Sequence, residues 1–158
     1  MSSPTNWMKK EYDDLVKKGF DWKPPVIGGP STGRAIIDDK ERIMLCANNY
    51  LSMSNHPKVK QAAIDAVKSH GAGSGSVRPI AGNMDIHNEL EDTIARFKNR
   101  EAALYYQTGF AVNSGLIPQL AGKNDSIISD QLNHGSIIDG VRLSGVKKEN
   151  RTIYAHND

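Results

Sequence analysis

Short apolar runs alternate with helical patterns over the last third of the chain, and this alternation constrains the fold more than any other feature. Three apolar runs of strand length lie at residues 102–106, 126–129 and 151–154. Two segments with apolar residues at helical spacing, 111–120 and 136–143, separate them. Parallel strands need a crossover between them, and helices usually supply it. We therefore predict an α/β fold with a mostly parallel sheet.

The first hundred residues predict further elements. In order they are a helix over residues 5–18, an irregular arm over 23–30, a hairpin of 34–37 and 43–47, and two helices that begin near residues 57 and 85. Gly19 should end the first helix, and Asp38 with Asp39 should form the hairpin turn. Pro57 suits a first helical turn, and Asp85 is expected as an N-cap. The helix from Pro57 should end near His70 and Gly71. The arm is rich in proline and glycine, so it should run over a surface, for example that of a partner.

Composition excludes several classes of function. The 158 residues carry a net charge of +2, with acidic and basic residues mixed, which does not suit a nucleic-acid surface. A single cysteine forms no internal disulfide, and Cys46 lies in an apolar run, so we expect it to be a buried strand residue. No run approaches the ~18 apolar residues of a membrane span, and no signal peptide is evident. A cytoplasmic protein without membrane or nucleic-acid partners is expected.

Polar residues follow two successive predicted strands, where each strand gives way to a helix. Open α/β folds bind ligands at this carboxyl edge of the sheet. At the first junction, Thr108, Gly109 and Phe110 expose the opening amides of a helix, where backbone donors and the helix dipole favour an anion. The segment is interpreted as a phosphate cradle, or as an ordinary strand-to-helix turn with a threonine cap. Two such junctions in tandem predict a site for a planar, phosphorylated cofactor.

The second junction carries His134, preceded by Asp130 and Asn133. The imidazole of His134 is a candidate to stack on a flat cofactor, to donate a proton, or only to cap the helix. His87 and Glu91 have a spacing that some metal ligands use, but no third ligand is evident. We therefore expect no metal site and interpret these two residues as a solvated helix face.

Two further groups have open alternatives. Asn48 and Asn49 end the Cys46 segment, where their amides would contact a substrate or cap the loop. Arg78 lies in a glycine-rich loop and would bind an anion or form an interdomain ion pair.

Taken together, these segments resemble the α-oxoamine synthases, a branch of the fold-type I pyridoxal 5′-phosphate enzymes. The matches run in order through residues 46–51, 55–57, 69–71, 76–78, 82, 87–91, 108–113, 127–130, 133–143 and 156–158. Ser76-Val77-Arg78 and residues 136–143 are similar to the 2-amino-3-ketobutyrate CoA ligases (glycine C-acetyltransferases). The 8-amino-7-oxononanoate synthases usually carry a basic cluster before the Pro-Val of the arm, where this chain has residues 20–26.

The resemblance implies the amino-terminal part of an aspartate aminotransferase-like large domain. Residues 1–45 would form an N-terminal helix, arm and hairpin, and residues 46–158 the first part of the cofactor-binding domain. The implied reaction joins a small amino acid, glycine by the nearest likeness, to an acyl-CoA such as acetyl-CoA and releases free CoA. The implied cofactor is pyridoxal 5′-phosphate, in a homodimer with the active site at the interface.

By the same resemblance, Gly109 and Phe110 bind the cofactor phosphate beside Thr108. His134 is implied as both the catalytic residue and the ring that stacks on the cofactor, and Asn48 as a substrate contact. No lysine matches the family's Schiff-base position, so that residue is expected beyond Asp158, in a longer enzyme, and this stretch alone should be inactive. An 8-amino-7-oxononanoate synthase-like enzyme, a non-catalytic dimerising partner and a nucleotide-binding module remain alternatives.

Overall fold

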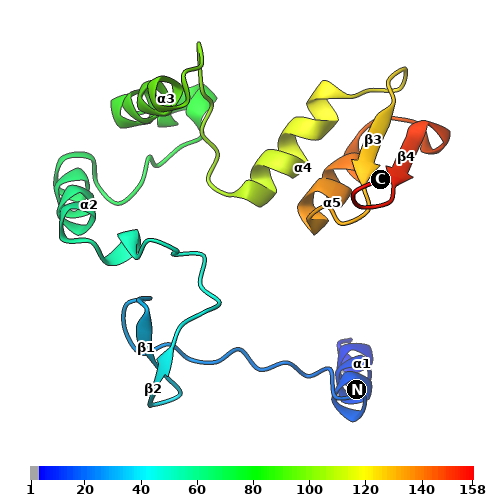
Figure 1. Cartoon of the computed structure of the whole chain (residues 1–158), viewed down its shortest axis with the longest axis horizontal. Helices are drawn as coiled ribbons and strands as arrows, with labels where there is room; N and C mark the ends of the chain where they lie inside the picture. The colour runs from blue at the N-terminus through cyan, green and yellow to red at the C-terminus, as the bar shows by residue number, and fades with distance from the viewer. Residues whose placement is uncertain (1–3) are drawn as a thin grey trace. The chain divides into compact units, whose positions relative to one another are not determined.

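The computed structural model describes residues 4–158, which form two compact units that divide between Ser74 and Gly75. The first holds helix α1 (Asn6–Lys17), strands β1 (Arg34–Ile37) and β2 (Lys40–Ile43), and helix α2 (Pro57–His70). The second holds α3 (Asp85–Lys98), α4 (Gly109–Leu120), β3 (Ile127–Asp130), α5 (Gly135–Leu143) and β4 (Arg151–Tyr154), as Figure 1 labels them.

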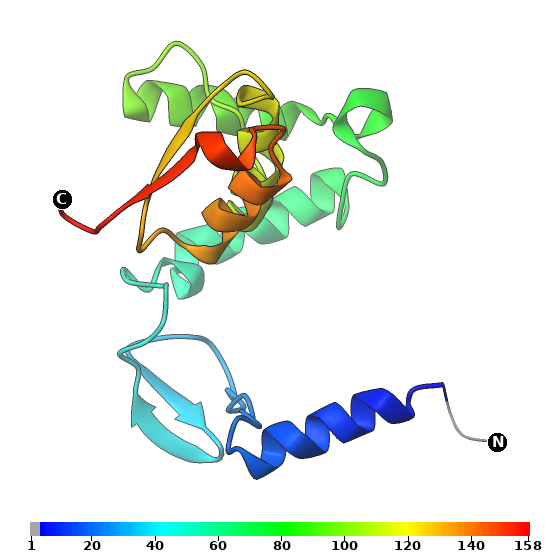
Figure 2. The same cartoon turned by 90° about the vertical axis from the view of Figure 1, so that its right-hand side faces the viewer.

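The hairpin of the first unit is tighter than predicted. β1 and β2 pair antiparallel with Arg34 opposite Ile43, so the second strand ends where the sequence suggested that it begins (Figure 2). Asp38 and Asp39 both have positive φ, 48° and 61°, as a two-residue hairpin turn requires. Because β2 ends at Ile43, Cys46 lies in a loop and is exposed, which corrects its predicted burial in a strand.

The helix ends of the first unit follow the sequence signals. α1 ends at Lys17, two residues before Gly19, whose φ is +73°. Pro57 opens α2, and the ring of His56 accepts a hydrogen bond from the amide of Lys58. Gly71, with φ of +79°, ends α2 as predicted.

The second unit confirms the α/β prediction through a strand–helix–strand segment. β3 and β4 pair in parallel with Ile127 beside Arg151, and α5 forms the crossover between them. Residues 102–106 form no strand, contrary to the prediction, because no described strand pairs with them. Asp85 is the first residue of α3 and not its N-cap, a position that Met84 takes.

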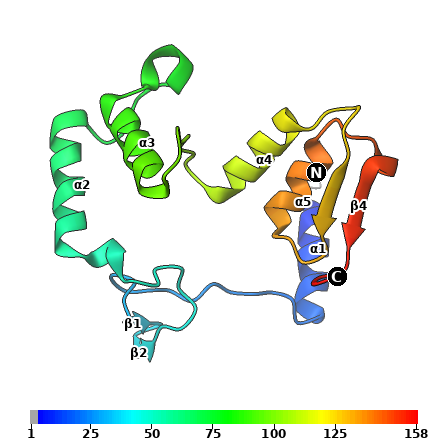
Figure 3. The ribbon, with the colours of Figure 1, turned by 45° about the horizontal axis from the view of Figure 1, so that its top comes forward.

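Helices α4 and α5 pack directly against each other, as Figures 1 and 3 both show. A β-carbon built on Gly140 of α5 would overlap the carbonyl oxygen of Asn113 and would lie 2.9 Å from the Cδ1 atom of Ile117. Only glycine permits this approach. The contact holds the beginning of α5 beside the first turns of α4.

Few apolar side chains are buried among the described residues. The fully enclosed ones are small, and Val146, at 1% exposure, is the largest. Many large ones are exposed, including Trp7, Tyr12 and Phe110. No helix in residues 4–158 is long and apolar enough to cross a membrane.

Candidate functional site

The first turn of α4 leaves two backbone donors open. Thr108 is the N-cap, and its Oγ1 atom accepts a hydrogen bond of 3.0 Å from the amide of Ala111. Among the hydrogen bonds of the described residues, none uses the amides of Gly109 or Phe110. The helix dipole adds partial positive charge at this end. These two amides are therefore free to bind an anion.

The space beside Gly109 is empty of protein atoms. A β-carbon built there would meet no atom within 4 Å, and the φ of Gly109 is not positive. Neither packing nor backbone strain therefore requires glycine at this position. A ligand that lies close to the backbone accounts for a glycine at this position. The position thus fits the phosphate of the expected cofactor.

His134 caps the beginning of α5 with its ring. The Nδ1 atom accepts a hydrogen bond of 3.1 Å from the amide of Ser136 and lies 2.7 Å from the Oγ atom of the same serine. The structural alternative for His134, that of a helix cap, is thus present. It occupies Nδ1 alone and leaves Nε2 available.

A hydrogen bond joins the two junctions. The side-chain amide of Asn113, one turn beyond Gly109 on α4, donates to the Oγ atom of Ser136 over 2.9 Å. The link from α4 to the ring of His134 therefore passes through a single buried hydroxyl. Sequence reasoning assigned no role to Asn113 or Ser136. The signals were their spacing, four residues after Gly109 and two after His134, which place each one on the same helix end as the predicted site residue.

A carboxylate and an imidazole meet past the ends of β3 and β4. Nδ1 of His156 lies 3.0 Å from Asp130, whose carboxylate also accepts a 2.7 Å hydrogen bond from the amide of Leu132. The Leu132 amide first and His156 second lower the pKa of Asp130 below its ordinary value. Asp130 is therefore ionised at neutral pH and holds the turn that leads to His134.

Arg78 forms an ion pair within the second unit. Its guanidinium binds both oxygens of Glu91, at 2.5 and 2.9 Å, and its Nε donates to the side chain of Asn83. Glu91 also accepts from the amide of Tyr105, and the ring of His87 stacks on that of Tyr105 at 6.4 Å. The prediction of a solvated face for His87 and Glu91 is therefore wrong. Both anchor the segment that leads to the start of α4.

Glu91 should make the second unit sensitive to acid. Hydrogen bonds from Arg78 and from the Tyr105 amide lower its pKa from 4.5 to about 2. The ion pair thus contributes fully above pH 4.5, and the contribution disappears as the pH falls towards 2. We expect Glu91→Gln to lower the free energy of unfolding at pH 7 and to flatten its decline below pH 4.5.

Chemical unfolding across this pH range is the measurement. Glu89→Gln is the control, because Glu89 is exposed on the same helix and makes no ion pair among the described residues. An equal pH dependence for Glu91→Gln and the unchanged protein would contradict the assignment.

Asn48 and Asn49 belong to the first unit and differ in their surroundings. Asn49 donates to the carbonyl of Ser31 and to the Oγ atom of Ser54, so it fixes the loop. Asn48 is exposed and takes part in none of the side-chain hydrogen bonds of the described residues. The capping alternative therefore applies to Asn49, and Asn48 keeps its amide available.

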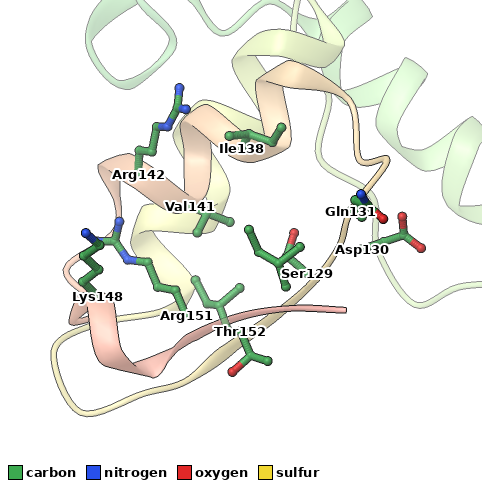
Figure 4. Close-up of a pocket in the computed structure, with 11 residues that line it drawn as sticks. Ser129, Asp130, Gln131, Ile138, Val141, Arg142, Lys148, Arg151 and Thr152 are labelled. Atoms are coloured by element: carbon green, nitrogen blue, oxygen red, sulfur yellow. The ribbon is translucent and has the colours of Figure 1, made fainter. Parts of the chain in front are cut away.

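A cavity in the second unit does not include the predicted cofactor contacts, although Asp130 lines it. Its volume is about 370 Å³, and β3, α5 and β4 line it with residues such as Ser129, Val141 and Thr152 (Figure 4). None of Thr108, Gly109, Phe110 and His134 lines it. The guanidinium of Arg151, another lining residue, donates to the carbonyls of Ser144 and Val146.

Comparison with known proteins decides the family. The sequence model of the family described as "Aminotransferase class I and II" matches residues 40–158. The chain belongs to the aminotransferase class I and II family. The 8-amino-7-oxononanoate synthase of Alkaliphilus metalliredigens (strain QYMF) is 47% identical over 96% of this chain and 38% of its own length. That of Thermoanaerobacter pseudethanolicus is 49% identical over 97% of this chain. The chain thus spans about two fifths of the length of these relatives.

Solved structures also resemble this chain, and they carry a different enzyme name. The serine palmitoyltransferase of Sphingomonas wittichii matches 99% of this chain and 39% of its own, with a TM-score of 0.81 and 30% identity. A serine palmitoyltransferase from S. paucimobilis, solved with bound pyridoxal phosphate and myriocin, has a TM-score of 0.84 and 28% identity. The comparisons confirm three expectations: the resemblance to the α-oxoamine synthases, the α/β architecture of fold type I, and pyridoxal 5′-phosphate as the cofactor of the family. The narrower likeness to glycine C-acetyltransferase is corrected, because these relatives carry other names.

Proposed function

We propose that the native protein, meaning the gene product that contains residues 1–158, is a pyridoxal-phosphate-dependent acyltransferase of the α-oxoamine synthase type. The observation that carries the proposal is the pair of open amides at Gly109 and Phe110, joined through α4 to the His134 ring. The family match and the relatives support the same reaction class.

Each residue of the first junction has a defined task in this proposal. The amides of Gly109 and Phe110 donate to the cofactor phosphate, and the dipole of α4 favours its negative charge. Thr108 satisfies the next amide, that of Ala111, and so fixes the direction of the first turn. When bound, the cofactor supplies a pyridine ring that accepts the electrons released at the amino acid's Cα.

The other candidates act on the ring and on the substrate. We assign His134 to cover the face of the pyridine ring and to donate from Nε2 to the acyl carbonyl. Asn48 contacts the substrate at the interface of a homodimer. The arm and hairpin of residues 1–45 precede the cofactor-binding domain, which begins at residue 46. The exposed apolar side chains of α1, including Trp7 and Tyr12, support a covered surface in the assembled protein.

The preferred substrates follow from the name of the sequence relatives. The nine-carbon product 8-amino-7-oxononanoate divides at its new carbon–carbon bond into a two-carbon amine unit and a seven-carbon acyl chain that ends in a carboxylate. We therefore propose alanine and a dicarboxylic acyl-CoA as substrates. Alanine loses its carboxyl group as CO2, and the remaining two-carbon unit forms the new bond to the acyl carbonyl as CoA leaves. Glycine with acetyl-CoA is the second candidate, favoured by the absence of a basic cluster before Pro25 and Val26.

Release of free CoA by the native protein tests the proposal. With pyridoxal phosphate present, alanine and the seven-carbon dicarboxylic acyl-CoA should give faster release than glycine and acetyl-CoA. The reverse order would establish the second candidate. Binding of pyridoxal phosphate without CoA release from either pair would indicate a non-catalytic partner, and binding of nucleotides alone would indicate a nucleotide module.

His134 is expected to contribute to cofactor affinity by stacking. Loss of the ring in His134→Ala should weaken pyridoxal phosphate binding by about five-fold, as expected for ~1 kcal/mol of ring stacking. His134→Phe is the matched variant, because it keeps a flat ring and removes the nitrogen donors. We expect it to retain most of the affinity and to lose turnover. Unchanged affinity and turnover in His134→Ala, measured by equilibrium dialysis and CoA release, would contradict both tasks.

A further inference from the structure

We propose that Ser136 and Asn113 are positioning residues that hold the ring of His134 with its proton on Nε2. The task of that proton, donation to a substrate carbonyl, rests on the proposed function. The placement of the proton rests on hydrogen bonds alone.

The amide of Ser136 determines the tautomer. A backbone N–H only donates, so Nδ1 of His134, 3.1 Å away, must present its lone pair. In a neutral imidazole the proton then lies on Nε2. Ser136 is only 2% exposed, so little water competes for this contact. The first turn of α5 thus fixes both the orientation of the ring and the location of its proton.

Asn113 determines the direction of the Ser136 hydroxyl. Its side-chain N–H donates to the Oγ atom over 2.9 Å and occupies an acceptor position of that oxygen. The hydroxyl proton is then directed towards Nδ1 of His134, 2.7 Å away. Two donors therefore face Nδ1, and both oppose a proton there. Both hydrogen bonds from Asn113 through Ser136 to the ring run from donor to acceptor in the same direction. A change at Asn113 should therefore alter the hydrogen bond at Nδ1 of His134.

The same bonds couple the ring to the cradle. Asn113 lies one turn after Gly109 on α4, and the close approach at Gly140 holds α4 against α5. No hydrogen bond among the described residues uses Nε2 of His134. The ring is therefore held at a set distance from the open amides, and Nε2–H is its remaining donor.

Asn113→Asp tests the direction of this chain with almost no change in shape. A carboxylate only accepts, so the Ser136 hydroxyl would turn towards the new carboxylate and present a lone pair to Nδ1. We expect the ratio of the two tautomers to shift towards Nδ1–H by about five-fold, the effect of one ordinary hydrogen bond. The measurement is nitrogen NMR of the native protein labelled with ¹⁵N-histidine. Ser136→Ala should give a smaller shift in the same direction, because alanine removes the hydroxyl donor without presenting a lone pair to Nδ1.

Ser129→Ala is the matched control, because that hydroxyl lies nearby and binds Asn133 instead of His134. It should leave the tautomer of His134 unchanged. A proton on Nδ1 in the unaltered protein would overturn the proposal without any variant. An unchanged tautomer ratio in Asn113→Asp would also overturn it.

The outcomes separate this inference from the proposed function. If pyridoxal phosphate does not bind but the tautomer shifts as expected, the positioning inference holds and the enzymatic proposal fails. If the cofactor binds and the protein releases CoA, but Asn113→Asp changes neither the tautomer nor kcat, the enzymatic proposal holds and the positioning inference fails. In an active enzyme, we expect Asn113→Asp to lower kcat more than it raises KM, because the amides of Gly109 and Phe110 are untouched.

Discussion

Gly140→Ala should lower the stability of the native protein by about 2 kcal/mol. The new β-carbon would overlap the carbonyl oxygen of Asn113, a backbone atom that moves only if α4 moves. Overpacking of this kind costs up to ~3 kcal/mol, and the better helix propensity of alanine returns ~1 kcal/mol. The free energy of unfolding in urea is the measurement.

Gly135→Ala provides the control at the other end of α5. A β-carbon at Gly135 meets no atom within 4 Å, so we expect no loss of stability and a gain of at most ~1 kcal/mol from helix propensity. Gly140→Ala should in addition weaken cofactor binding, since it forces apart the helices that carry Asn113 and Ser136. Equal stabilities for the two variants would show that α4 and α5 do not pack as closely as described.

Gly109→Asp should reduce the affinity for pyridoxal phosphate by about 100-fold, through lost hydrogen bonds to a charged group and like-charge repulsion. The carboxylate would occupy the empty space beside Gly109 and would itself face the open amides. An acidic residue at a helix N-terminus stabilises the helix by ~0.3–1 kcal/mol. Affinity should therefore fall while stability rises, and damage to the fold does not produce that combination.

Equilibrium dialysis and thermal unfolding of the same samples give the two quantities. Gln119→Glu is the control, because it adds the same charge at an exposed position near the other end of α4. It should leave the affinity close to that of the unchanged protein. If Gly109→Asp keeps its affinity, the cradle assignment is wrong and the phosphate binds to another part of the protein.

The fold was predictable from sequence where local signals decide the structure. Pro57, Gly19 and Gly71 ended or began helices as expected, because each acts through its own backbone geometry. Prediction failed where the structure depends on partners distant in sequence. Residues 102–106 have strand composition but no described strand beside them. The Cys46 error was instead local, because β2 begins directly after the two-residue turn, at Lys40, and ends at Ile43.

The candidate site shows the same division. The helix starts at Thr108 and His134 were predictable, since polar residues before a helical pattern are visible in one sequence, although only the second start follows a described strand. The contacts that connect them were not, because the spacing of Asn113 and Ser136, 23 residues apart, does not reveal that two helices meet. For Arg78 the sequence left an anion site and an interdomain ion pair open, and it did not indicate the observed partner, Glu91 of the same unit.

The amide signals of Gly109 and Phe110 provide the most direct test of the phosphate cradle. Their NMR shifts in the native protein are followed as pyridoxal 5′-phosphate is added, and again with pyridoxal, which lacks the phosphate. Both amides should shift strongly with the phosphorylated compound and little with the other. Saturable binding of pyridoxal phosphate that leaves these two amides unmoved would contradict the account.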